Sequence, residues 1–246
     1  MKVIIDEQYR KFLVEDNLEK DLQLDFGVLS KEQLNSAQNG DVLQSHLGKK
    51  IFVLDASFVD VFEKIKRGPQ IITLKDAAMI SAYTGISDKS IIVDAGAGSG
   101  ALISYFGNIV KPSGKVYSYE VSPEFIKIAS ENIKQLNLDS VVSIKNKNIY
   151  DGIDETDVDV ISLDLPEPWR VIEHANKSLK TGGYFVSYLP SMTQVQIFVS
   201  SLTKNYRVEQ VFECLQRNWI VRGQVARPEN MMLGHTGFII IARRLY

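Results

Sequence analysis

The feature that most constrains the fold is a buried strand that runs directly into a glycine-rich turn and then into a helix. Residues 90–100 read SIIVDAGAGSG, an apolar run followed by three alternating glycines, and residues 101–110 read ALISYFGNIV, which is typical of a helix. Glycine allows the backbone to approach a ligand closely, and the first N–H groups of a helix are free to bind one. This unit therefore predicts an α/β sheet with a ligand at the carboxyl ends of its strands.

Strands and helices alternate after residue 69, which predicts a Rossmann-like doubly wound sheet. The segment VDVISLDL (158–165) is apolar on both faces, so we expect it to be central. The other expected strands are 115–120, 141–146 and 184–189, with 207–222 and 235–246 as a final antiparallel pair. The expected helices are 74–85, 122–137 (with Ser122 as N-cap and Pro123 in its first turn), 169–180 (closed by Gly182 and Gly183) and 193–205.

The N-terminal quarter has a different pattern. Short β-like runs at 11–16, 25–30 and 49–57 are separated by turn signals such as Asn39-Gly40. We therefore predict a small, mostly-β N-terminal domain over residues 1–63 and a second domain over residues 64–246.

Composition excludes several classes of protein. The 246 residues are 45% hydrophobic and 24% charged, and Cys214 is the one cysteine, so collagen-like, disordered and disulfide-scaffold chains are excluded. No apolar run approaches the roughly 18–20 residues of a membrane span, and the N-terminus lacks the shape of a signal peptide. We expect a cytoplasmic protein with no membrane partner.

The charge is unevenly distributed. The net charge is −2, but residues 204–246 hold seven Lys or Arg and only three Asp or Glu. A near-neutral chain is not expected to bind nucleic acid tightly and non-specifically, although one basic face could still recognise it.

Trp219 and the run FIIIA (238–242) are expected in the core.

A carboxylate follows the glycine turn at the distance expected for nucleoside binding. Glu120 ends the next strand and can accept hydrogen bonds from ribose hydroxyls. The glycine spacing also fits a dinucleotide, so an NAD-dependent reductase remains open. Asp94 beside a cationic ligand and the tighter spacing to Gly100 favour S-adenosylmethionine. Beyond the third strand, Asn148 is expected to contact the adenine amino group, or else to be a turn residue. Phe125 and Ile149 are expected to cover the two faces of the adenine ring.

An acidic, proline-rich motif follows the central strand. Asp164 begins DLPEPW (164–169) at the sheet edge where open α/β sheets bind ligands. Pro166 and Pro168 restrict the backbone, so Asp164 is expected to be held in place, with Trp169 packed beneath it. The alternative is a buried aspartate of purely structural use.

These motifs together resemble a known family, the tRNA (adenine-N1)-methyltransferases that modify adenine 58 in the T loop, in their archaeal and bacterial homotetrameric form. The resemblance runs from about residue 26 to the end. Its most specific parts are DLPEPW, YLPSMTQV (188–195) and GHTGF (234–238), in that order. They are joined by RGPQII (67–72), Lys75-Asp76, DAGAGSG (94–100), Tyr119-Glu120 and Arg227-Pro228.

The resemblance implies methyl transfer from S-adenosylmethionine to N1 of adenine 58, with adenine 57 left open as a second target, tRNA as partner and a class I methyltransferase fold. It assigns Asp164 as the catalytic residue. Together with the glycine turn, it predicts a cofactor site made of Gln70, Ile72, Asp94, Gly96, Gly98, Ser99, Gly100, Ala101, Leu102, Glu120, Phe125, Asn148, Ile149 and Asp164. The substrate-binding candidates are Thr73, Pro166, Trp169, Tyr188 and Pro190. The N-terminal domain would assist tRNA binding. The three histidines lack metal-ligand spacing, so no metal is expected.

One position departs from the family pattern. Many relatives have Tyr or His followed by Pro where this chain has Thr73 and Leu74, so an aromatic that could stack on the target base is missing. Two other functions stay open: methylation of a small molecule or protein side chain, and a non-catalytic RNA-binding subunit.

The expected chemistry needs one carboxylate. Asp164 would accept a hydrogen bond from the adenine N6 amino group and stabilise the positive charge that develops on the base. The base must first be turned out of the folded tRNA. Arg and Lys side chains of residues 64–75 and 217–227 are expected to contact phosphates, and His235 is expected to make a structural hydrogen bond.

Overall fold

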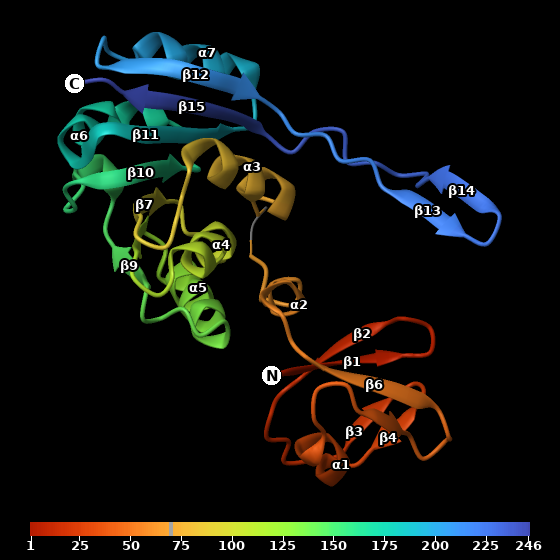
Figure 1. Cartoon of the computed structure of the whole chain (residues 1–246). Coiled ribbons are helices and arrows are strands. Elements are labelled where there is room, and N and C mark those ends of the chain that lie inside the picture. The colour runs from red at the N-terminus through yellow and green to blue at the C-terminus, as the bar shows by residue number, and fades with distance from the viewer. Residues whose placement is uncertain (69–70) are drawn as a thin grey trace. The chain divides into compact units, whose positions relative to one another are not determined.

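The computed structural model describes residues 1–68 and 71–246, which divide into two compact units, Met1–Ile65 and Lys66–Tyr246 (Figure 1). Each unit has its own core. No helix of the described chain combines the length and the apolar character needed to cross a membrane.

The first unit is mostly β-structure. Its four-stranded sheet has the order β2-β1-β6-β5. Between β2 and β5 in sequence, β3 and β4 form a separate two-stranded sheet. A core around Ile4, Leu29, Leu34 and Val53 is almost fully buried. The elements are β1 (Lys2–Asp6), β2 (Lys11–Val14), β3 (Leu22–Leu24), β4 (Gly27–Leu29), α1 (Lys31–Ser36), β5 (Val42–Gln44), β6 (Lys50–Asp55) and α2 (Phe58–Phe62).

The second unit is the doubly wound sheet, as the sequence predicted. Its strand order is β12-β15-β11-β10-β7-β8-β9, and β10 lies in the centre. Strands β9, β8, β7, β10 and β11 are parallel, whereas β15 is antiparallel to both β11 and β12. The strands are β7 (Ile91–Ala95), β8 (Lys115–Glu120), β9 (Val142–Asn146), β10 (Val158–Leu163), β11 (Leu179–Leu189), β12 (Tyr206–Phe212) and β15 (Phe238–Arg244).

Helices cover both faces of this sheet (Figure 1). One face packs against η2 (Pro168–Val171), α6 (Ile172–Ser178) and α7 (Met192–Ser201), in a core that includes Val93, Leu163 and Phe185. The other face carries α3 (Leu74–Thr84), α4 (Ala101–Val110) and α5 (Pro123–Gln135), which contact one another in sequence order. The short η1 (Ile149–Asp151) follows β9.

Two helix signals from the sequence are confirmed at α5. Ser122 is its N-cap and accepts a hydrogen bond from the Phe125 N–H, and Pro123 occupies the first turn. The prediction that Gly182 and Gly183 close the helix expected over residues 169–180 is wrong. Helix α6 ends at Ser178, and both glycines lie inside β11, near a register shift against β10.

The C-terminal part differs from the prediction in one respect. The run 207–222 is not one strand, because β12 ends at Phe212 and Trp219 begins a separate hairpin. In that hairpin β13 (Trp219–Arg222) pairs with β14 (Val225–Pro228). The expectation that Trp219 belongs to the core is therefore wrong, since its exposed fraction is 59%. Ile239–Ala242, in contrast, are fully buried.

Candidate active site

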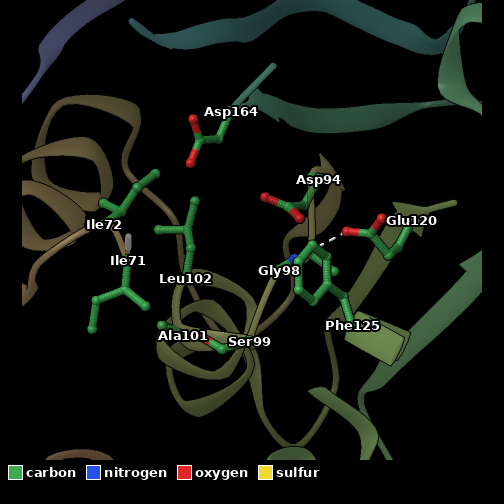
Figure 2. Close-up of a pocket in the computed structure, with 12 residues that line it drawn as sticks. Ile71, Ile72, Asp94, Gly98, Ser99, Ala101, Leu102, Glu120, Phe125 and Asp164 are labelled. Atoms are coloured by element: carbon green, nitrogen blue, oxygen red, sulfur yellow. Dashed lines mark hydrogen bonds between the residues drawn. The ribbon is translucent and has the colours of Figure 1, made fainter. Parts of the chain in front are cut away.

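A pocket of about 260 Å³ lies at the carboxyl ends of β7, β8 and β10 (Figure 2). Glu120 and Phe125 border one side of it, Ile71 and Ile72 border the other, and Asp164 lies across from Asp94. Among the described residues, those that line it are Ile71, Ile72, Asp94, Gly96, Ala97, Gly98, Ser99, Ala101, Leu102, Glu120, Phe125 and Asp164. The structure thus brings together ten of the predicted cofactor residues from separate parts of the chain.

The glycine turn forms the floor of the pocket. Gly96 has a φ of +88°, and a Cβ atom there would lie 2.5 Å from the backbone oxygen of Asp164. Gly98 has a φ of +52°, but the nearest atom to a Cβ there would be 3.9 Å away. Gly96 is therefore required for packing against the neighbouring strand, whereas Gly98 leaves space on the ligand side.

Backbone N–H groups orient the carboxylate of Glu120. Oε2 accepts a hydrogen bond of 3.1 Å from Gly98, and Oε1 accepts bonds of 2.8 and 2.9 Å from Val121 and Ser122. Since each carboxylate oxygen has two acceptor sites, Oε2 retains one for a ligand hydroxyl.

Asp94 lies at the end of β7 and is 2% exposed. Ser118 on the adjacent strand donates a hydrogen bond of 2.7 Å to its carboxylate. Burial raises the pKa of Asp94 to about 7, against the lowering effect of that hydrogen bond, and the charges of Asp164 and Glu120 add to the rise. A cationic group in the pocket would favour the ionised form.

Asp164 borders the open part of the pocket, where β10 ends. Its backbone N–H donates a bond of 3.0 Å to Ala95, which fixes the first residue of the loop against β7. The side chain is reached by water through the pocket, yet the surrounding protein removes enough solvent to raise the pKa of its carboxyl to about 6. Among the described residues none donates a hydrogen bond to that carboxylate, so it is available to a ligand.

Two residues of the pocket lining, Ile71 and Ala97, and one buried residue that supports it were not predicted as site residues. Asn132 on α5 is fully buried and donates bonds of 2.8 Å to the carbonyl oxygens of Ser99 and Lys66, while its own Oδ1 accepts from the Lys66 N–H. It therefore clamps the glycine turn to the start of the second unit. Its only sequence signal is an asparagine on the apolar side of an amphipathic helix.

Several predicted cofactor residues lie elsewhere. Gly100 is the N-cap of α4 and packs against Ala129 rather than lining the pocket. Asn148 is exposed, and its Oδ1 caps η1 by accepting from Tyr150, as a turn residue does. Ile149 is buried in the core beside the sheet. Gln70 lies outside the described residues.

The five substrate candidates do not line the pocket. Thr73 caps the start of α3 directly after Ile72, and Tyr188 is buried with its hydroxyl directed to Asp76. Pro166 and Pro190 are exposed, and each carbonyl accepts a side-chain hydrogen bond, from Gln194 and His235 respectively. Trp169 packs on the core beneath the loop.

The bonds made by His235, which also contacts Glu213, agree with its expected structural role. The expectation that Lys75 belongs to a phosphate-binding surface is wrong. Its side chain is only 12% exposed and is paired with a buried aspartate.

The residues present fit a polar, nucleoside-like ligand. Ser99 Oγ is buried beside the turn, and no described residue hydrogen-bonds to it, so a ligand would satisfy it. The open space over Gly98 and the acceptor site on Glu120 lie in the same pocket. Within the described ranges no three His, Cys, Asp or Glu side chains are grouped to hold a metal ion.

Comparison with known proteins identifies the family. The family model for the GCD14 subunit of the tRNA methyltransferase complex matches residues 63–236. The chain is 34% identical over 269 residues to the tRNA (adenine(57)-N(1)/adenine(58)-N(1))-methyltransferase TrmI of Methanocaldococcus jannaschii. The aligned region covers 98% of this chain and 94% of the relative.

Two solved structures share the whole fold. One is a SAM-dependent O-methyltransferase from Thermotoga maritima, with a TM-score of 0.90 and 32% identity over 100% of this chain and 92% of that one. The other is the tRNA (m1A58) methyltransferase TrmI from Aquifex aeolicus, with a TM-score of 0.82 and 26% identity over 100% and 96%. This chain belongs to the GCD14 family of tRNA methyltransferase subunits.

Proposed function

We propose that this protein transfers a methyl group from S-adenosylmethionine to N1 of adenine 58 in the T loop of tRNA. The observation that carries the proposal is Asp164, whose carboxylate has no partner among the described residues and shares one pocket with the glycine turn and Glu120. The Methanocaldococcus, Thermus and Aquifex relatives are named for this activity.

The pocket residues divide the work of holding the donor. Glu120 would accept a hydrogen bond from a ribose hydroxyl, and Phe125 would cover a face of the adenine. Asp94 would face the cationic end of the ligand, where a positive charge favours its carboxylate form. When bound, S-adenosylmethionine supplies an electrophilic methyl group.

Asp164 would act on the acceptor base. Adenine N1 carries an in-plane lone pair, so correct placement of the base in line with the methyl group supplies much of the rate. Asp164 would accept a hydrogen bond from N6, stabilise the developing cationic base and finally take the N6 proton. With a pKa of about 6, the carboxyl of Asp164 is mostly ionised at neutral pH. The same pKa is high enough for this carboxylate to take up a proton from N6.

Recognition of tRNA is expected to involve more than one unit and more than one copy. The N-terminal unit, residues 1–63 in our prediction, would assist tRNA binding, and the protein would act as a cytoplasmic homotetramer. The hairpin β13–β14 and the following segment expose Trp219, Val221 and Met231 by 59%, 72% and 87%. Exposed apolar side chains of this kind suit contact with a second copy. Multi-angle light scattering tests the oligomeric state, and the salt dependence of tRNA binding tests the phosphate contacts.

Adenine 57 is a further possible target, because the Methanocaldococcus relative is named for both positions. Mass spectrometry of nucleosides and fragments from tRNA transcripts with adenine or guanine at position 57 separates the two sites.

The likeness to the Thermotoga O-methyltransferase supports a second candidate, methyl transfer to a small-molecule hydroxyl. A hydroxyl needs a base to remove its proton, and Asp164 is the carboxylate placed to do so. Label in an added small acceptor, but none in unmodified tRNA, would favour this candidate and overturn the proposal.

The decisive test compares Asp164→Asn with Glu167→Gln. Glu167 lies in the same loop but is exposed and paired with Arg170 at 3.0 Å, outside the pocket lining. We expect Asp164→Asn to lower methylation of tRNA at least about 100-fold while S-adenosylhomocysteine still binds, and Glu167→Gln to remain within about threefold of wild type. Near-normal methylation by Asp164→Asn would overturn the assigned role.

A further inference from the structure

A buried ion pair lies behind one wall of the pocket. Asp76 on α3 is fully buried, and its Oδ1 accepts a hydrogen bond of 2.7 Å from Nζ of Lys75, which is 12% exposed. Lys75 also donates to the carbonyl of Cys214 at 2.7 Å and to Oγ1 of Thr236 at 2.6 Å. All three ammonium hydrogens therefore have acceptors.

The pair belongs to a closed ring of polar contacts. Asp76 Oδ2 accepts from the hydroxyl of Tyr188 at 3.2 Å and from that of Thr73 at 2.9 Å. Thr236, which accepts from Lys75, lies close enough to Tyr188 to lower the pKa of its hydroxyl, against the larger raising effect of burial. The ring thus runs from Lys75 through Thr236 and Tyr188 to Asp76 and back to Lys75.

The ring joins four segments that are distant in sequence: the start of α3, the end of β11, the segment after β12 and the segment before β15. Thr73, at the start of α3, directly follows Ile72 of the pocket wall. Gly237 allows this packing, since a Cβ atom there would lie 2.4 Å from the Tyr188 ring. The charge of Asp164 contributes to raising the pKa of Tyr188, after the larger effect of burial, so this end of the ring lies within electrostatic reach of the site.

Stability alone is a poor reason for such an arrangement. The desolvation of two charges offsets most of their attraction, and an apolar pair of similar volume is often at least as stable. An ion pair does, however, hold directional hydrogen bonds that an apolar pair cannot hold. The ring is therefore suited to fixing geometry.

We propose that Lys75 and Asp76 are positioning residues for methyl transfer, because their pair holds the Ile71–Ile72 wall at the place that sets the target base against Asp164. This inference rests on the proposed function and adds two residues to it.

The expected effect is on the transfer step rather than on donor binding. The adenosine side of the pocket is built from Glu120 and Phe125, on β8 and α5, which do not belong to the ring. The ring lies next to the opposite side, since Thr73 directly follows Ile72, which forms that side together with Ile71 (Figure 2). A small displacement of that side misaligns the reacting atoms, to which the rate is very sensitive.

The test uses the single variant Lys75→Met and the double variant Lys75→Met/Asp76→Leu in the full chain. We expect the single variant to melt at a lower temperature, because Asp76 loses its partner, and the double variant to regain most of that loss. Both should keep S-adenosylhomocysteine affinity within threefold and lose at least 30-fold in kcat for tRNA. The control is Lys180→Met, which breaks a more exposed pair with Asp159 near the starts of β11 and β10, far from the pocket lining, and should leave kcat within threefold.

A double variant whose kcat recovers with its melting temperature would overturn the inference, since the role would then be purely structural. Hydrogen exchange of the 71–77 segment in the enzyme bound to S-adenosylhomocysteine is a readout that needs no tRNA. It should accelerate in both variants, and unchanged exchange would also overturn the inference. Wild-type enzyme that labels no tRNA in the same assay would instead defeat the proposed function.

Discussion

Asp94 and Asp164 extend from the carboxyl ends of the adjacent parallel strands β7 and β10 into one pocket. The pKa of Asp94 is raised to about 7, chiefly by burial and in part by the charge of Asp164. Two acids in one pocket therefore titrate close to physiological pH, and each is expected to leave a different signature.

The rate of methylation should rise with pH through the titration of Asp164. Its pKa is about 6, and the carboxylate form is the one that accepts the N6 hydrogen bond. We expect kcat for tRNA to increase between pH 5.5 and 7.5, measured as initial rates at constant ionic strength and saturating donor. A flat profile over this range would contradict the role of Asp164 as an acceptor.

Asp94→Asn should separate stability from ligand binding. Because the folded-state pKa of Asp94 is raised, the folded protein holds a proton that the unfolded chain releases above about pH 4. Its contribution to stability is therefore present at low pH and lost as pH rises towards 7. We expect Asp94→Asn to stabilise the ligand-free protein at pH 8 by about 2–4 kcal/mol, with little change at pH 4.

The same variant should lose at least about tenfold in affinity for S-adenosylmethionine, since the carboxylate that faces the cationic ligand is gone. Thermal melts at the two pH values and calorimetric titration measure the two effects. The exposed Asp151 provides the control, because Asp151→Asn should change neither. Equal melting temperatures of Asp94→Asn and wild type at pH 8 would argue against a raised pKa of Asp94.

Substitutions in the glycine turn should differ although all place alanine at positive φ. Gly96→Ala puts a methyl group 2.5 Å from the Asp164 carbonyl oxygen, so we expect several kcal/mol of destabilisation or failure to fold. Gly98→Ala meets no close protein atom and should cost only about 1–2 kcal/mol of backbone strain, while its methyl group intrudes on the ligand side. Gly40→Ala, in open space on the first unit, controls for strain alone. Equal unfolding free energies for all three would contradict this geometry.

Asn132→Ala should weaken both the fold and donor binding. It leaves the Lys66 N–H and the Ser99 and Lys66 carbonyls without their side-chain partner, for a loss of about 2–3 kcal/mol. The released Ser99 carbonyl loosens the glycine turn, so affinity for S-adenosylhomocysteine should fall, as calorimetry can measure. Asn132→Asp keeps the size of the side chain and the acceptor but lacks the amide donor, and should be impaired as well. Unchanged affinity in both variants would show that the clamp does not act on the pocket.

Sequence patterns located the elements that carry long, regular signals. The strand β7, the turn after it, helix α5 with its Ser122 cap and the central strand β10 all follow from hydrophobic periodicity and capping chemistry. Where the local signals were weak or competed with one another, the predicted elements were wrong. Gly182 and Gly183 read as a helix end but lie inside β11, because Leu179 before them and Tyr184 after them pair with β10, and the register shifts between these two pairs.

Local sequence patterns were enough to predict the doubly wound fold, the glycine turn and the identity of Asp164, Asp94 and Glu120 as the acids at the strand ends. These depend on local spacing and on the rule that parallel strands deliver their carboxyl ends to one edge. Only the tertiary structure decided which neighbours each group has. It turned Tyr188 towards Asp76, enclosed Lys75 and placed Asn132 under Ser99. Those contacts join residues 33 to 161 positions apart, and no local pattern encodes such partners because packing of the whole sheet and its helices creates them.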